Sequence, residues 1–182
     1  MRNMLFRSIA ALPLTERAPK PDDAALAELA GRVQTTARRV LGRSLSIRQV
    51  DAGSCNGCEL EIHALNNAFY DLERFGIHFV ASPRHADVLL VTGPVTQNMR
   101  EALQRTYEAT PEPKWVVAVG SCAADGGVFA GGHGVVGGVG QVIPVDLHIP
   151  GCPPRPRDLL AGLLALMTRR LPRQKRANSG AS

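Results

Sequence analysis

Short continuous apolar runs alternate along this chain with stretches of helical spacing. The runs are rich in β-branched residues and predict strands at residues 46–50, 77–80, 88–91, 115–119 and 142–149. Apolar residues three or four positions apart predict helices over residues 22–41, 58–75, 96–108 and 160–167. Because strands mostly alternate with helices, the pattern predicts an α/β fold with an open, mostly parallel sheet flanked by helices.

The two ends of the chain differ from this middle part. We expect an amino-terminal arm with an amphipathic basic helix over residues 1–43, a folded domain over 44–171, and a basic, disordered tail over 172–182. One face of the early helix carries Leu26, Leu29, Val33 and Val40. This helix is compatible with ordinary packing and also with a basic helix that lies on a partner or a membrane surface.

Composition narrows the functional class. The net charge of +5 comes largely from basic residues near the two ends, and only 4% of residues are aromatic. A nucleic-acid platform is therefore disfavoured, because basic residues and aromatic side chains are not interleaved. No run reaches the roughly 20 apolar residues that a membrane span requires, so we expect no transmembrane segment.

The four cysteines carry the candidate chemistry. Cys55 and Cys58 form a Cys-x-x-Cys pair in a turn of small residues, while Cys122 and Cys152 each follow a predicted strand. Ligands of open α/β sheets bind at the carboxyl ends of the strands, where all three of these loops are expected. A cubane iron–sulfur cluster needs about four thiolate ligands and close backbone approach, which Gly57, Gly120 and Gly151 would permit. The pattern favours one cluster held by all four thiols.

Three other interpretations of the cysteines stay open at this level. The Cys-x-x-Cys pair is also typical of a thioredoxin-type redox site, although Cys122 and Cys152 would then be idle. A structural zinc ion takes four cysteines too, but usually as two close pairs. Four unrelated buried cysteines are the third alternative.

Other polar residues carry weaker signals. Glu59 and Glu61 follow the second cysteine directly, and we interpret them as solvated acids at a helix start, with a proton or partner path at Glu59 as the alternative. The five histidines show no ligand spacing. The glycine-rich stretch over residues 125–140 matches no phosphate-binding motif, and we expect a flexible loop there.

Four ordered blocks of the sequence resemble a known family. Residues 51–61, 82–96, 120–122 and 142–154 are similar to the small-subunit family shared by [NiFe] hydrogenases and respiratory complex I, especially the small subunits of formate-hydrogenlyase-type and other membrane-bound group 4 hydrogenases. This resemblance implies a flavodoxin-like domain with one [4Fe–4S] cluster. By position, Cys55, Cys58, Cys122 and Cys152 match the cluster ligands and metal-binding residues of that family, and no catalytic residue is expected in the chain itself.

The resemblance also implies partners. We expect an electron-transfer subunit that relays electrons between a ferredoxin-like iron–sulfur subunit and the [NiFe] site of a large catalytic subunit. Membrane-anchor subunits would hold it peripherally at the cytoplasmic, inner face of the cell membrane. The alternative is a complex I-like NADH:quinone oxidoreductase 20 kDa subunit that passes electrons to quinone. Complex I subunits of this kind have two adjacent cysteines where this chain has Cys55-x-x-Cys58, which favours the hydrogenase side.

Overall fold

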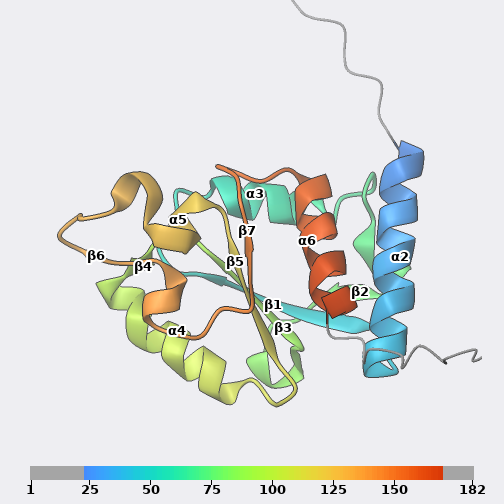
Figure 1. Cartoon of the computed structure of the whole chain (residues 1–182), viewed down its shortest axis with the longest axis horizontal. Coiled ribbons are helices and arrows are strands. Elements are labelled where there is room, and N and C mark those ends of the chain that lie inside the picture. The colour runs from blue at the N-terminus through green and yellow to red at the C-terminus, as the bar shows by residue number, and fades with distance from the viewer. Residues whose placement is uncertain (1–22, 170–182) are drawn as a thin grey trace, which may run out of the picture.

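Five parallel strands form the central sheet in the order β2-β1-β3-β5-β7 (Figure 1). The computed structural model describes residues 23–169, so the predicted arm before residue 23 and the basic tail lie outside the described residues. The strands are β1 (Leu45–Asp51), β2 (Ile77–Phe79), β3 (Val88–Thr92), β5 (Trp115–Val119) and β7 (Leu147–Ile149). Such an order, with its reversal between β1 and β3, is flavodoxin-like. It confirms the predicted fold class.

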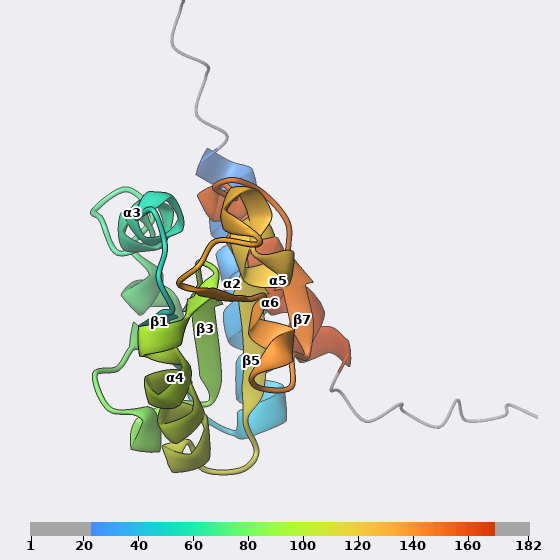
Figure 2. The ribbon, with the colours of Figure 1, turned by 90° about the vertical axis from the view of Figure 1, so that its left-hand side faces the viewer.

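Helices cover both faces of this sheet (Figure 2). They are α2 (Asp23–Leu41), α3 (Gly57–Ala64), α4 (Gln97–Ala109), α5 (Ser121–Asp125) and α6 (Pro156–Arg169). Single 3₁₀ turns occur at η1 (Leu72–Phe75), η2 (Pro83–His85), η3 (Gly127–Phe129) and η4 (Val139–Gln141). A small antiparallel pair, β4 (Val95–Thr96) with β6 (Val135–Gly137), lies beyond the end of β3.

The alternation of side chains along the strands divides the core into two layers. Val88 and Leu90 of β3 join the layer beneath α2, α3 and α6, whereas Leu89 and Val91 join the layer beneath α4 and α5. Because β3 and β5 are buried on both faces, their sequences read as continuous apolar runs. The three-layer arrangement follows directly from that pattern.

The basic helix α2 belongs to the same core as the sheet. Ala30, Val33 and Ala37 are buried, and the helix packs against α6. Its apolar face is therefore covered within the chain, as the packing interpretation expects. The exposed side of the helix carries Arg32, Arg38 and Arg39 together with Glu28.

Two predicted elements are wrong in extent. The helix predicted to run to residue 75 ends at Ala64, because the side-chain oxygen of Asn67 accepts hydrogen bonds from the N–H groups of Phe69 and Tyr70 and stabilises a turn instead. Phe69, predicted on the apolar face, is 53% exposed. The last strand begins only at Leu147, because Pro144 has no N–H to contribute to a ladder.

The stretch predicted as a flexible loop, residues 125–140, is largely structured. It contains η3, β6 and part of η4, and it is pinned to the domain by hydrogen bonds such as Gln97 N–H to the carbonyl of Gly134 (2.8 Å). Gly138 is buried, and a Cβ there would come within 2.0 Å of the Ala124 carbonyl oxygen. Glycine at this position permits close packing rather than mobility.

Candidate iron–sulfur cluster site

Three loops at one edge of the sheet carry the four cysteines. Cys55 and Cys58 lie after β1, Cys122 begins α5 after β5, and Cys152 follows β7. Since all these strands are parallel, their carboxyl ends meet at one edge, next to α3 and α5 in Figure 2. The structure thus brings all four sequence-predicted residues to the expected edge.

Glycine contacts show how closely these loops approach one another. A Cβ on Gly120, after β5, would stand 2.8 Å from the Cys58 sulfur. A Cβ on Gly57 would lie 3.6 Å from the Cys55 sulfur and 3.9 Å from the ring of Pro153, which follows Cys152. The Cys55–Cys58 turn therefore contacts both other cysteine loops. Gly120 has a φ of 86°, a left-handed conformation that also favours glycine.

Backbone hydrogen bonds join the loops after β5 and β7. The N–H of Gly120 donates to the carbonyl of Ile149, and the N–H of Ser121 donates to the carbonyl of Gly151, each at 2.8 Å. The Ser121 hydroxyl donates to the same Gly151 oxygen at 3.2 Å. These bonds fix Cys122 and Cys152 relative to each other through the backbone of their neighbours.

The thiols are close enough to perturb one another. Burial raises the pKa of Cys58 to about 12, and the charges of Glu59, Cys122, Cys55 and Cys152 add to that rise in decreasing order. Burial also raises the pKa of Cys122, followed by the charges of Cys152 and Cys55. Metal ligation requires thiolates, so these thiols must lose protons when a metal centre binds. Cys58 and Cys122 are therefore each within electrostatic reach of Cys55 and Cys152.

The donor set, four thiols on three loops, is compatible with a cubane cluster, which takes four thiolate ligands. Between residues 23 and 169, no group of three or more His, Cys, Asp or Glu side chains is arranged to hold one metal ion. Zinc would draw four sulfurs to about 2.3 Å from one point, whereas a cubane binds one thiolate at each of four iron corners and keeps the sulfurs further apart. The backbone of Val128 partly offsets the rise in the pKa of Cys122. The four cysteines fit a [4Fe–4S] cluster.

Glu59 is the residue that sequence reasoning misplaced. It is only 4% exposed, and neither carboxylate oxygen has a hydrogen-bond partner among the described residues. The interpretation as a solvated acid is therefore wrong. Its spacing from Ile62 and Leu65, three and six residues later and both buried, was the signal that placed it on the inner face of α3.

Exposed apolar side chains occur in the elements that carry two of the cysteine loops. Leu60 in α3 is 64% exposed, and in η3, which follows α5, Val128 is 83% and Phe129 40% exposed. Cys55 and Cys152 are themselves exposed. This end of the domain therefore presents both thiols and apolar side chains to its surroundings.

An open flavodoxin-like sheet with four cysteines at its carboxyl edge is compatible with a small subunit of an oxidoreductase complex. Comparison with known families agrees, because residues 55–166 match the family described as NADH ubiquinone oxidoreductase, 20 Kd subunit. The chain belongs to this family. It is a small subunit of the hydrogenase or complex I type.

Several relatives support this assignment. The chain is 48% identical over 126 residues to a probable membrane-bound hydrogenase subunit mbhJ of Pyrococcus furiosus, covering 69% of this chain and 75% of that protein. It is 48% identical over 120 residues to formate hydrogenlyase subunit 7 of Escherichia coli, which covers 66% of this chain but only 47% of that protein. It is 53% identical over 109 residues to an NADH-quinone oxidoreductase subunit of Citrifermentans bemidjiense, covering 60% and 64% of the two chains.

Solved structures agree with the fold. A chain of the archaeal membrane-bound sulfane sulfur reductase superposes with a TM-score of 0.63 at 38% identity, covering 76% of this chain and 75% of that one. A chain of an NAD⁺-reducing [NiFe]-hydrogenase gives a TM-score of 0.56 at 22% identity, covering 71% of this chain and 94% of that one. The second likeness concerns the fold alone. No helix between residues 23 and 169 combines the length and apolar character needed to cross a membrane.

Proposed function

We propose that this chain is an electron-transfer subunit that holds one [4Fe–4S] cluster with Cys55, Cys58, Cys122 and Cys152. The observation that carries this proposal is the meeting of three distant loops, in which Gly120 leaves room for the Cys58 sulfur and Gly57 for that of Cys55. When bound, such a cluster accepts and releases single electrons.

The residues of the chain would prepare the site in three ways. The four thiolates would provide one ligand for each iron corner. Gly120 and Gly127 keep the backbone close to the sulfurs, since a Cβ on Gly127 would stand 2.9 Å from that of Cys122. Burial of Cys122 limits the access of water on the inner side, whereas the exposed Cys55 and Cys152 face outward.

The open side of the site supports a protein partner. The exposed Cys55 and Cys152, together with the exposed apolar side chains of Leu60 in α3 and of Val128 and Phe129 in η3, would suit a partner surface with apolar parts. We propose that a large [NiFe]-type catalytic subunit covers this side and that a ferredoxin-like subunit delivers or receives electrons. Membrane-anchor subunits would then hold the assembly at the cytoplasmic face of the membrane. The names of the hydrogenase and formate hydrogenlyase relatives support this choice.

Identification of the partner tests this proposal. The tagged chain is purified without oxygen from cells that express its native complex, and the co-purifying proteins are identified by mass spectrometry. We expect a large subunit that carries two Cys-x-x-Cys motifs, the arrangement that suits nickel. A large subunit without these motifs would instead indicate a quinone-linked enzyme of the complex I type and would contradict the hydrogenase assignment.

A matched pair of variants locates the contact. Leu60→Asp places a charge on the exposed apolar residue of α3, and we expect the large subunit to be lost from the purified complex. Ala109→Asp places the same charge on an exposed residue at the far end of α4, and the complex should be retained. Equal recovery with both variants would contradict a docking face around the cysteines.

A further inference from the structure

Strand β2 covers only the first half of the outer edge of β1. Three residue pairs join the two strands, from Leu45–Ile77 to Ile47–Phe79, and the Val80 N–H donates to the carbonyl of Ile47 at 2.8 Å. β1 then continues to Asp51 without a neighbour on that side among the described residues. The second half of β1 is therefore an open edge.

The open edge presents backbone groups that are ready to pair. Alternate residues of a parallel strand direct their N–H and C=O groups to the same side, so Gln49 and Asp51 continue the row begun by Leu45 and Ile47. Within residues 23–169, the backbone of Gln49 and of Asp51 makes no hydrogen bond on this side. Two donors and two acceptors, about 6.6 Å apart along the strand, thus lie unused.

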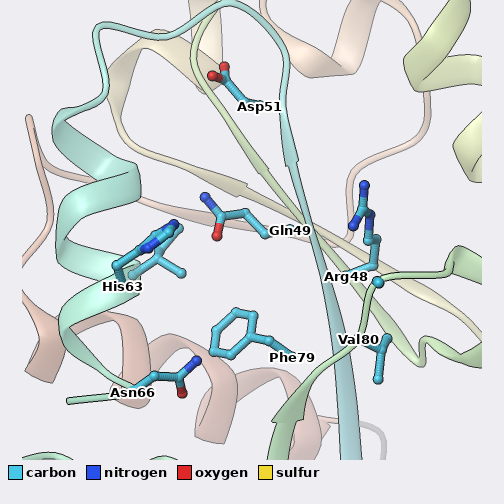
Figure 3. Close-up of a pocket in the computed structure, with 9 residues that line it drawn as sticks. Arg48, Gln49, Asp51, His63, Asn66, Phe79 and Val80 are labelled. Carbon is cyan, nitrogen blue, oxygen red and sulfur yellow. The ribbon is translucent and has the colours of Figure 1, made fainter.

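A groove of about 430 Å³ runs beside this edge (Figure 3). One wall is α3 and the turn after it, with His63 and Asn66. The other is the end of β2, Phe79, with Val80 and Ala81 after it. Figure 3 shows the Gln49 side chain pointing toward His63 and the Phe79 ring pointing toward Asn66. Arg48 also lines the groove, and its Nε atom is buried with no hydrogen-bond partner in the described part of the chain.

These features specify the occupant. Only an extended backbone offers donors and acceptors with the repeat of a strand, and its added position would prolong the line of β2. The guanidinium of Arg48, which lines the groove, can donate to an acidic side chain or to a carbonyl. We infer that an extended segment of a partner subunit, with an acidic or amide side chain, binds here by strand addition to Gln49 and Asp51.

Strand addition at this edge would affect the turn that leads to Cys55. The Asp51 carboxylate accepts hydrogen bonds from the N–H groups of Gly53 and Ser54, each at 2.8 Å, and so shapes the turn that leads to Cys55. A segment paired with Asp51 would hold this turn from its outer side. The inference rests on the proposed function only in requiring a partner subunit.

Site-directed crosslinking in the native complex tests the inference. A photoreactive benzophenone side chain replaces Ala81 in the groove or, as the control, Ala109 at the far end of α4; both residues are exposed. We expect the probe at position 81 to crosslink to a single short segment of a co-purifying subunit, and the control to give no such product. Crosslinks only to residues 1–22 or 170–182 of this chain, or to a second copy, would overturn the inference.

Amide hydrogen exchange provides a measurement that needs no variant. The Gln49 and Asp51 amides should exchange at least about tenfold more slowly in the complex than in the isolated chain, as new hydrogen bonds protect them. The Ala52 amide, already bonded to the Thr92 carbonyl at 3.0 Å, should change little. Equal rates for Gln49 and Asp51 in both samples would overturn the inference and leave the proposed function standing if the partner co-purifies. Absence of any partner would overturn both.

Discussion

The two ends of the central sheet are built differently. At the amino end, polar groups satisfy one another. The buried Asp87 carboxylate accepts from Arg43 at 3.0 and 2.5 Å and from the Ser46 N–H at 2.9 Å, and Lys114 Nζ donates to two carbonyls at the end of α4, those of Tyr107 and Thr110. At the carboxyl end, four thiols gather and the buried Glu59 carboxylate has no described partner.

We interpret the amino end as the part that stabilises the sheet and the carboxyl end as the part that serves the function. Hydrogen-bonded polar groups at the amino end stabilise the sheet without any further component. The buried Glu59 carboxylate and the Cys122 thiol at the other end are costly to bury alone, which supports the proposed cluster and partner subunit. Substitutions at the two ends should therefore have opposite effects on cluster content and on folding.

The largest effect is expected from Cys122→Ser. A hydroxyl is a poor ligand for iron, so the variant should lose the cluster, and iron should fall from about four atoms per chain to nearly none. The fold should persist, because Cys122 lies at the end of the sheet and not among its strands. Iron analysis and circular dichroism measure the two effects. Full iron content in the variant would show that Cys122 is not a ligand.

Gly120→Ala should remove most of the cluster without changing any thiol. The added Cβ would stand 2.8 Å from the Cys58 sulfur and displace it. Gly131→Ala is the matched control, because Gly131 has a similar positive φ of 77° but no atom within 4 Å of an added Cβ. The control should lose only about 1 kcal/mol of stability and keep its iron. Equal iron in both variants would contradict the close approach of Gly120 to Cys58.

Asp87→Ala should weaken the fold and spare the cluster. It leaves the Ser46 N–H and the Arg43 guanidinium without their shared acceptor, and we expect unfolding free energy to fall by about 2 kcal/mol. Glu101→Ala, which breaks an exposed pair with Arg105 on α4, should cost less than about 0.5 kcal/mol. Denaturant titrations compare the two. An equal loss of unfolding free energy in both variants would contradict the larger contribution that we expect from the Asp87 hydrogen bonds.

Glu59→Gln should have the smallest effect. The substitution removes a negative charge beside the thiols, which favours the reduced, more negative cluster and raises its midpoint potential by tens of millivolts, about 59 mV for each factor of ten in the equilibrium. Glu61→Gln, which is partly exposed, should shift the potential less because solvent screens its charge. EPR-monitored redox titration measures both. A larger shift of the midpoint potential in the Glu61 variant would contradict the stronger effect that we expect from the Glu59 charge.

Much of the sheet could be predicted from local sequence alone. Residues 88–92 and 115–119 are buried on both faces, so their apolar runs predict strands whatever surrounds them. The positions of Cys122 and Cys152 just after strands then predict a shared edge. Parallel pairing is the only further requirement, and it follows from the alternation of strands with helices.

Other features depend on contacts that the local pattern does not contain. Helix α3 ends early because the Asn67 side chain bonds the backbone of Phe69 and Tyr70, although the apolar spacing continues. The approach of Gly120 to Cys58 depends on how the β1 and β5 loops meet in space. The open edge of β1 exists because β2 ends at Phe79. The pattern of a strand as short as the three residues of β2 does not predict where the strand ends.

Metal and sulfide analysis of the anaerobically purified wild-type chain, combined with EPR spectroscopy, tests the central claim most directly. The account predicts a coloured protein with about four iron atoms and four sulfides per chain and an EPR signal in one redox state. A colourless, EPR-silent protein that contains zinc would contradict it.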